Sequence, residues 1–299
     1  MSGMSPRLAA LVAAGVIAGA AAGCGSDNGG SSSSGAAGAT STPSASSKLA
    51  AEVPKDIKAK GTLTVAADAT YPPNEFIGTN GKTVEGMDAD LANALAGTLG
   101  LKAKVQNATF DSIIPGLAAH KYDLGMSSFT DTKEREQTVD FVTYFSAGTS
   151  FFVKASGGPA INSLADLCGH KIAVEKGTTQ QTDAEKQAKK CGGNTTVSTF
   201  PDQNGANLAL SSGRAEVGMA DSPVAAYQVK QSNGQFKLSG QPYGTAPYGI
   251  AIPKGSGLAK PIRDALEQLM SDGKYQSILK KWGVQAGAIS KPVINGATS

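Results

Sequence analysis

An arginine preceded by hydroxyl side chains is the part of the sequence best suited to bind an organic acid. A short apolar strand is predicted to end at Met126, and a charged turn that carries Arg135 follows it. Between them lie four hydroxyl residues, Ser127, Ser128, Thr130 and Thr132. A guanidinium can hold both oxygens of one carboxylate in charge-assisted hydrogen bonds, which are about twice as strong as neutral ones. The alternative is a surface ion pair with Glu134, Glu136 or Asp140.

Four segments, found in this order, resemble the polar-amino-acid solute-binding proteins of bacterial ABC importers. They are VAADATYPPNEF (65–76), VEGMDADLANALAGTLG (84–100), FDSIIPGLAAHKYDLGMSSFTDTKEREQTVDF (110–141) and VGMADSPVAAY (217–227). Each is a weak match alone, but the ordered set is specific, and the likeness covers most of residues 58–284. The resemblance implies the type 2 periplasmic-binding fold, an α/β protein of two lobes with a ligand cleft and a two-strand hinge.

The resemblance also assigns groups that would hold the charged ends of an α-amino acid. Arg135 matches the arginine that binds the α-carboxylate, and Thr130 and Thr179 match residues that complete its shell. Asp221 matches the acid that takes the α-ammonium, and Ser128 matches a position whose carbonyl also meets the ammonium. Without the resemblance, Asp221 would be interpreted as the cap of the following helix.

A second group of matched residues would surround the ligand's side chain. Tyr71 and Phe110 match the aromatic residues that enclose it, while Asp68 and Ser127 would line its far end. Each has a structural alternative, since the two rings can be ordinary core and Asp68 can be a turn residue.

The sequence departs from the family pattern at two positions that bear on specificity. Asn74 stands where the family usually has phenylalanine, and Glu175 stands where some amide-binding members carry lysine. Acids at Asp68 and Glu175 favour a polar or cationic ligand side chain over a large apolar one.

Composition and charge exclude several other kinds of site. The formal net charge of the 299 residues is +3, with acids and bases interspersed, so no nucleic-acid partner is expected. The two histidines, His120 and His170, give little material for a metal site or a Ser-His-Asp triad. A sequence similar to the end of a phosphate loop, at 81–83, has Phe76 where that motif needs its first glycine. No cofactor is therefore expected.

The first 23 residues have the pattern of an export signal. Arg7 precedes an apolar run of 16 residues, 8–23, which is shorter than the roughly 20 that a spanning helix needs. A retained membrane helix is the alternative. Residues 21–24 resemble a bacterial lipobox, although Ala21 replaces the preferred leucine. Lipidation of Cys24 is predicted, which would hold the mature protein at the outer face of the cytoplasmic membrane.

Residues 24–57 are predicted to be a lipidated cysteine followed by a disordered tether. Residues 25–47 consist mostly of Gly, Ser, Ala, Thr and Pro. They contain too few large apolar side chains to offset the entropy that would be lost on ordering. A coil of this length reaches about 25–30 Å on average.

The resemblance implies two lobes, with a discontinuous lobe 1 formed by about 58–151 and 247–299 and an inserted lobe 2 formed by 152–246. The chain is expected to cross between lobes at 157–159 and again at 248–252. Expected elements include strands at 62–68, 171–175 and 216–220, a hairpin around 80–81, helices at 88–99, 179–190 and 206–215, and two amphipathic helices within 258–282. Residues 283–299 are expected to be partly frayed.

Two cysteines, Cys168 and Cys191, flank the strand and helix predicted between 171 and 190. An exported chain with two cysteines besides a lipidated one is expected to join them. Closing a loop of this size would contribute roughly 3 kcal/mol to stability.

These features predict a monomeric, extracytoplasmic lipoprotein that captures an α-amino acid and delivers it to an ABC permease. Closure of the lobes over the ligand would create the form that the permease recognises. One alternative is an enzyme similar to the cyclohexadienyl dehydratases of this fold, although no acid/base pair stands out. Another is a tethered sensor or adhesin that serves no transporter.

Overall fold

The computed structural model describes residues 46–298. The predicted export signal, Cys24 and most of the predicted tether lie outside this part. None of the helices within 46–298 combines the length and the apolar character needed to cross a membrane.

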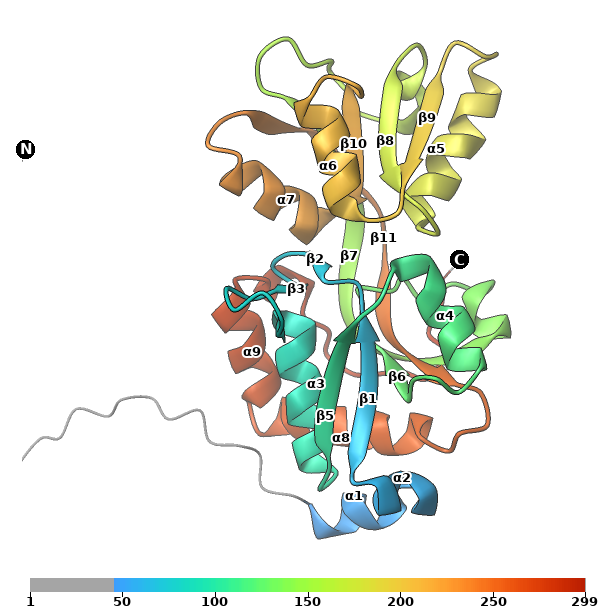
Figure 1. The fold of residues 1–299 in the computed structure, drawn as a ribbon, viewed down its shortest axis with the longest axis vertical. Helices are drawn as coiled ribbons and strands as arrows, with labels where there is room; N and C mark the ends of the chain where they lie inside the picture. Colours follow the sequence, from blue (N-terminus) through green and yellow to red (C-terminus); the bar gives the residue numbers. More distant parts are fainter. Residues whose placement is uncertain (1–45, 299) are drawn as a thin grey trace, which may run out of the picture. The chain divides into compact units, whose positions relative to one another are not determined.

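One eight-stranded sheet runs through both lobes, in the order β5-β1-β6-β11-β7-β10-β8-β9 (Figure 1). Its strands are β1 (Thr62–Ala67), β5 (Lys102–Asn107), β6 (Leu124–Gly125), β7 (Val139–Lys154), β8 (Lys171–Glu175), β9 (Thr196–Phe200), β10 (Val217–Asp221) and β11 (Phe236–Pro253). A smaller sheet holds β2 (Thr70–Tyr71), β3 (Glu75–Ile77) and β4 (Val84–Glu85). The predicted hairpin around 80–81 is the β3–β4 pair.

The two long antiparallel strands, β7 and β11, belong to both lobes and form the hinge. Thr149 of β7 already pairs with Asp221 of β10, a lobe 2 strand, whereas Ala147 pairs with Ala246 of β11. The register of the β7–β11 pair shifts between Tyr243 and Ala246. The first crossing therefore lies inside β7, and its predicted position at 157–159 is wrong because those residues follow the end of the strand.

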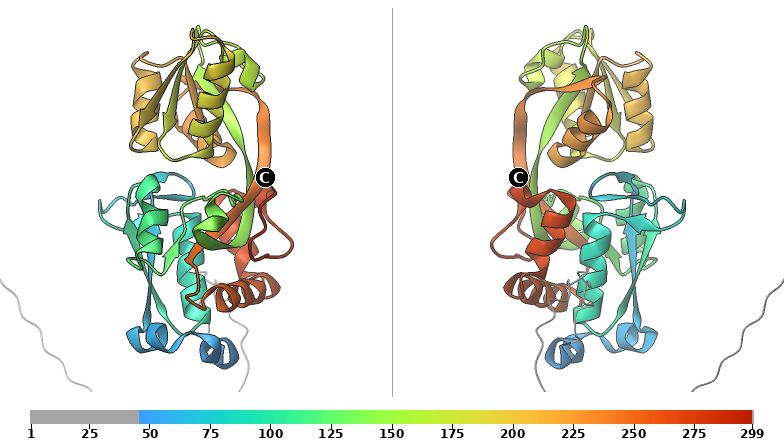
Figure 2. Two further views of the ribbon diagram at one scale, coloured as in Figure 1. Left: turned by 90° about the vertical axis from the view of Figure 1, so that its right-hand side faces the viewer. Right: turned by 90° about the vertical axis from the view of Figure 1, so that its left-hand side faces the viewer.

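Helices cover both faces of the sheet in each lobe (Figures 1 and 2). They are α1 (Ser47–Glu52), α2 (Lys55–Lys60), α3 (Met87–Thr98), α4 (Phe110–Ala118), α5 (Thr179–Lys190), α6 (Gln203–Ser211), α7 (Ser222–Gln231), α8 (Ala259–Ser271) and α9 (Lys274–Trp282), with short 3-10 turns at Arg135–Gln137, Leu164–Leu167 and Gln285–Gly287. The helix expected at 206–215 begins earlier, because Asp202 caps it by accepting a hydrogen bond from Gly205 N.

The predicted tether is wrong at its C-terminal end, where residues 47–60 form α1 and α2. Leu49, Val53 and Ile57 recur at intervals of four, and all three are buried in the main core of lobe 1. This apolar stripe supplies the burial that the composition of the preceding residues lacks.

The expectation of a frayed C-terminus is also wrong for the residues described. Ile294 forms an isolated antiparallel bridge with Val142 of β7. Asn295 adds a backbone hydrogen bond to Phe141. This segment therefore extends the pairing at the edge of β7.

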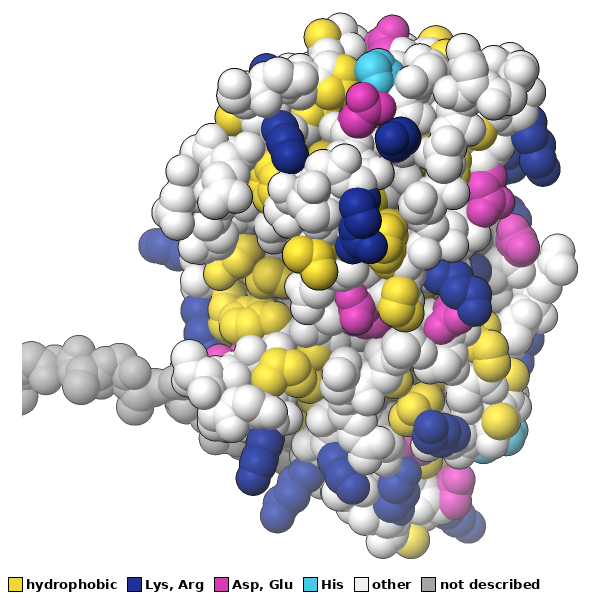
Figure 3. Space-filling model, turned by 45° about the horizontal axis from the view of Figure 1, so that its top comes forward, with side chains coloured by type: hydrophobic (Ala, Val, Ile, Leu, Met, Phe, Trp, Pro, Cys, Tyr) yellow, Lys and Arg dark blue, Asp and Glu magenta, His cyan; other side chains and the backbone are white. Residues whose placement is uncertain are grey.

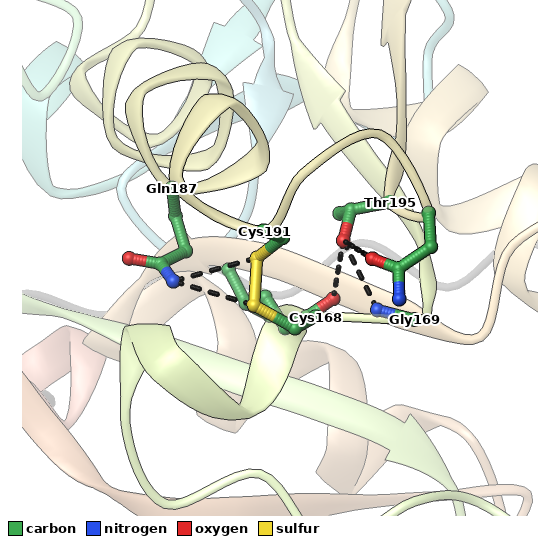
Figure 4. Close-up of a disulfide and its surroundings, with 7 residues drawn as sticks. Cys168, Gly169, Gln187, Cys191 and Thr195 are labelled. Atoms are coloured by element: carbon green, nitrogen blue, oxygen red, sulfur yellow. Dashed lines mark hydrogen bonds between the residues drawn. A yellow bond between two sulfur atoms is a disulfide. The ribbon is translucent and has the colours of Figure 1, made fainter.

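The predicted disulfide is present between Cys168 and Cys191, whose Cα atoms are 5.3 Å apart (Figure 4). It joins the turn before β8 to the C-terminal end of α5. The Nε2 of Gln187, one turn earlier in α5, lies 3.5 Å from both sulfur atoms. The bridge therefore fixes α5, whose opposite end faces the cleft.

Charged side chains are spread over the face drawn in Figure 3, on which lobe 2 comes forward. Lysines and arginines stand there singly among acidic and apolar side chains. Within residues 46–298, no cluster of His, Cys, Asp and Glu side chains could hold a metal ion.

Candidate functional site

A cleft between the lobes brings together residues from seven parts of the chain. The cavity that remains between these residues is only about 20 Å³, which is roughly the space that one water molecule needs. The lining residues are Tyr71, Phe110, Ser128, Thr130, Arg135, Thr178, Thr179, Gln180, Gln203, Ala220, Asp221 and Val224. The two lobes thus leave little open space between these side chains.

Arg135 reaches this cleft from a 3-10 turn of lobe 1. Its Nη1 donates to the carbonyl of Thr130 at 2.9 Å, and its Nη2 donates across the cleft to the carbonyl of Gly177 at 3.0 Å. The guanidinium lies over the rings of Phe110 and Phe129, 5.3 and 5.5 Å from their centroids. Burial lowers the pKa of Arg135, but an arginine stays charged at neutral pH. Arg135 therefore does not form the surface ion pair that was the alternative from the sequence.

Asp221 faces the cleft from the C-terminal end of β10 in lobe 2. Its carboxylate makes no cap hydrogen bond to α7. It accepts hydrogen bonds of 2.7 Å from Gln180 Nε2 and from Tyr248 Oη. Burial raises the pKa of Asp221 to about 6, although both donors and the charge of Arg135 act in the opposite direction. The carboxylate is thus ionised near neutral pH and held in a fixed orientation.

The N-terminus of α5 adds backbone donors beside these two charges. Thr178 caps the helix by accepting a hydrogen bond from Gln181 N at 3.1 Å. Thr179 and Gln180, the first residues of the helix, both line the cleft. The unpaired N–H groups of a first turn favour an anion, which here would lie close to Arg135.

Two acids lie beside Tyr71, next to the cleft. Asp68 is committed to protein donors, because its oxygens accept from Thr70 Oγ1 at 2.6 Å and Phe110 N at 3.0 Å. Glu175 is 1% exposed, and neither its oxygens nor the Tyr71 hydroxyl has a hydrogen-bond partner within residues 46–298. Burial, together with the nearby charge of Asp68, raises the pKa of Glu175 to about 10. Glu175 is therefore protonated at neutral pH.

Ser128 is positioned by a buried polar network that includes Asn74. Its φ of 52° lies in the left-handed region, which non-glycine residues seldom adopt. Ser128 N donates to Asp88 Oδ2 at 3.1 Å, and its Oγ accepts from Asn74 Nδ2 at 2.9 Å. Burial raises the pKa of Asp88 to about 6 and that of the neighbouring Glu75 well above its usual value. Asn74 therefore acts from behind the cleft wall.

Further contacts join the lobes at the edge of the cleft. Lys176 forms an ion pair with Asp111 of α4 at 2.9 Å. Gln203 N donates to Thr70 Oγ1 at 3.2 Å. Gly177 has a φ of 81°, and a Cβ added there would lie 3.0 Å from the Cβ of Asp111. A side chain at Gly177 would thus push against the opposite lobe.

Seven of the nine predicted ligand-binding residues line the cleft, and two do not. Asp68 and Ser127 lie outside the lining, and Ser127 Oγ accepts from Asp68 N at 2.8 Å. Sequence reasoning missed Thr178, Gln180, Gln203, Ala220 and Val224. The helix N-terminus at 178–180 could have indicated the first two.

Comparison with known proteins gives these observations a context. A model of the family described as bacterial extracellular solute-binding proteins, family 3, matches residues 63–285. The chain belongs to this family. It is also 32% identical over 253 residues to the arginine-binding protein of Corynebacterium glutamicum, and the match covers 83% of each protein.

Solved structures agree with the family assignment. An ancestral arginine-binding protein bound to arginine is 40% identical, with a TM-score of 0.71 over 74% of this chain and 98% of that one. An ancestral amino acid-binding protein described as a precursor of cyclohexadienyl dehydratase is 37% identical, with a TM-score of 0.68 over 79% of this chain and 99% of that one. The predicted two-lobed, type 2 periplasmic-binding fold is confirmed.

Proposed function

We propose that this family 3 solute-binding protein captures a free α-amino acid in its cleft and prefers a cationic side chain such as that of arginine. The observation that carries the proposal is the placement of Arg135 and Asp221 on one small cleft, from opposite lobes. A guanidinium and a carboxylate match the opposite charges of an amino-acid zwitterion. The Thr179 end of α5 adds donors for the same carboxylate.

The preference for a cation comes from the acids beside Tyr71. A positive charge that arrives beside buried, protonated Glu175 would lower its raised pKa and favour loss of its proton, because each charge lowers the cost of burying the other. Phe110 and Tyr71 supply flat apolar surfaces on which a guanidinium can stack. The arginine-binding relatives agree with this chemistry.

Ligand capture would be coupled to closure through the hinge strands. The zwitterion's two ends engage different lobes, so contacts to both become available only when the lobes meet. The ion pair of Lys176 with Asp111 already joins the lobes at the edge of the cleft.

Titration calorimetry with L-arginine, L-lysine, L-glutamine and L-leucine tests the proposal. L-arginine should bind most tightly and L-leucine least tightly. Among the four ligands, only L-arginine, or only L-arginine and L-lysine, should cause Glu175 to release a proton on binding. Proton release is measured by repeating each titration in two buffers of different ionisation enthalpy. Tightest binding of L-leucine, or no binding of any α-amino acid, would contradict the proposal.

The remaining parts of the proposed role concern the membrane. The protein would act as a monomer, anchored through Cys24, with lobe 1 formed by 58–151 and 247–299 and lobe 2 by 152–246, and would pass its ligand to an ABC permease. Cys24→Ala should release the exported protein into the medium. Retention of that variant at the membrane would refute the anchor.

The binding role is also proposed over the dehydratase alternative. Arg135 and Asp221 are both engaged in fixed hydrogen bonds, and the relative described as a dehydratase precursor is itself a binding protein. Conversion of prephenate by the purified protein would favour the enzyme. A sensor or adhesin role would be favoured if loss of the protein left amino-acid uptake unchanged.

A further inference from the structure

The last described residues of the chain pair with β7 and then continue to the turn that carries Arg135. Val293 N donates to Thr143 Oγ1 at 2.8 Å, and Thr143 N donates to Val293 O at 2.9 Å. Asn295 N donates to Phe141 O at 2.9 Å, and Asn295 Oδ1 accepts from Phe141 N at 2.8 Å. The segment is thus held in a defined register along β7.

The next two residues bind acids on both sides of Arg135. Gly296 N donates to Asp131 Oδ2 at 2.8 Å, and Ala297 N donates to Glu136 Oε1 at 3.1 Å. Asp131 is fully buried, and Glu136 directly follows Arg135. These two adjacent backbone donors, 165 and 161 residues from their acceptors in sequence, therefore bind on both sides of the arginine that would hold the ligand.

We propose that Gly296 and Ala297 form a clamp that positions Arg135 for ligand binding, by donating to Asp131 and Glu136. The clamp rests on the proposed function, because it acts on the residue that would hold the α-carboxylate. None of its residues lines the cleft, so it acts through the turn and not on the ligand.

The physical reason is the cost of removing donors from the buried carboxylate of Asp131 and the half-buried carboxylate of Glu136, whose other oxygen accepts from Lys133 Nζ at 2.9 Å. Burial raises the pKa of Asp131 to about 7, the Gly296 N–H lowers it, and the neighbouring Glu136 raises it again. Lys133 and Arg135 are the cations that interact with this pair. Without a donor, ionised Glu136 and Asp131 would repel each other and move the turn between them.

Two proline substitutions in the full chain form a matched test. Ala297→Pro removes the donor to Glu136 without changing any charge, whereas Thr298→Pro makes the same change one residue later and keeps both donors. At pH 8, Ala297→Pro should weaken L-arginine binding about tenfold, and Thr298→Pro should leave it within about twofold of the wild type. Equal affinities of the two variants would overturn the clamp.

A pH profile and a rescue separate positioning from a general loss of structure. At pH 5.5, protonated Asp131 can donate to Glu136 itself, so the ratio of variant to wild-type affinity should shrink to about threefold or less. Asp131→Asn in the Ala297→Pro background should restore binding at pH 8, because its amide supplies the missing donor. A loss that is independent of pH and not rescued would overturn the clamp.

Hydrogen exchange of the backbone amides tests the clamp in the absence of any ligand. The amides of Glu136 and Thr138, which close this turn onto Thr132 O and Arg135 O, should lose protection in Ala297→Pro but not in Thr298→Pro. If the wild type binds no amino acid, the proposed function fails, and this exchange difference still decides the clamp. If Ala297→Pro does not fold, removal of residues 296–299 is compared with removal of 298–299 by the same measurement.

Discussion

The two ends of the cleft differ in how far their charged groups are already satisfied. At one end, Arg135 donates to two carbonyls, and Asp221 accepts from Gln180 and Tyr248. At the other, Glu175 and the hydroxyl of Tyr71 are buried without partners among the described residues. Under the proposed function, the first end is preorganised for the groups that all α-amino acids share. The second retains unsatisfied polar atoms, which only certain side chains can satisfy, and should therefore determine specificity.

The largest effect is expected at the preorganised end. Arg135→Ala should cost about 2–5 kcal/mol in binding of every amino acid that the protein accepts, because the ligand carboxylate loses its strongest donor. Arg135→Lys should restore little of this, since an ammonium lacks the two-pronged geometry. Calorimetry with L-arginine and L-glutamine measures both variants. Binding of Arg135→Ala within threefold of the wild type would place the carboxylate elsewhere.

A smaller but selective effect is expected at the other end. Glu175→Gln should weaken L-arginine binding by about 1–3 kcal/mol, because the cation loses its ionisable partner, and should change L-glutamine binding little. The same titrations, run at pH 8, give the ratio of the two affinities. Equal losses for both ligands would show that Glu175 does not distinguish side chains.

The pH dependence should also differ between the two ends. The pKa of Asp221 is raised to about 6, and the ammonium requires its ionised form, so all affinities should fall about fivefold between pH 6 and pH 5. The pKa of Glu175, raised to about 10, has to fall when a cation binds, so L-arginine affinity should keep rising above pH 6. L-glutamine affinity should stay level there. Parallel profiles for the two ligands would contradict this distinction.

The smallest effect should follow from a change outside both ends. Gly177→Ala introduces a side chain at a positive φ and against Asp111 of the other lobe, so it should weaken binding of all ligands by about 1 kcal/mol. Small-angle scattering of the ligand-bound variant should report a more open average structure. An unchanged affinity would show that the lobes need not approach so closely at Gly177.

Much of the cleft could be predicted from the sequence, chiefly through the family resemblance, which supplied the roles of Arg135 and Asp221. Local patterns contributed less: strand periodicity placed Asp221 at the end of a strand, but the helix N-terminal residues Thr178 and Gln180 were missed. Arg135 follows a run of hydroxyls in a turn between two strands. Because the carboxyl ends of strands meet at one edge of a sheet, the residues that follow them were expected to share a site.

Other features depend on contacts between residues far apart in the chain. Glu175 and Asp68 are both acids in the sequence, but only their burial side by side makes one of them neutral at pH 7. Gln203 lines the cleft because Asp202 caps α6, so the helix begins earlier than apolar periodicity indicated.

Local periodicity and residue chemistry were enough to predict the alternation of strands and helices and the cysteine pair, whereas the charged residues for a zwitterion were assigned through the family resemblance. Long-range contacts were needed to show that residues 47–57 and the C-terminal segment are ordered. The first was expected to continue the disordered tether, and the second was expected to be partly frayed. They are ordered because Leu49 and Val53 pack into a core built by distant helices, and because Gly296 meets a buried carboxylate 165 residues away.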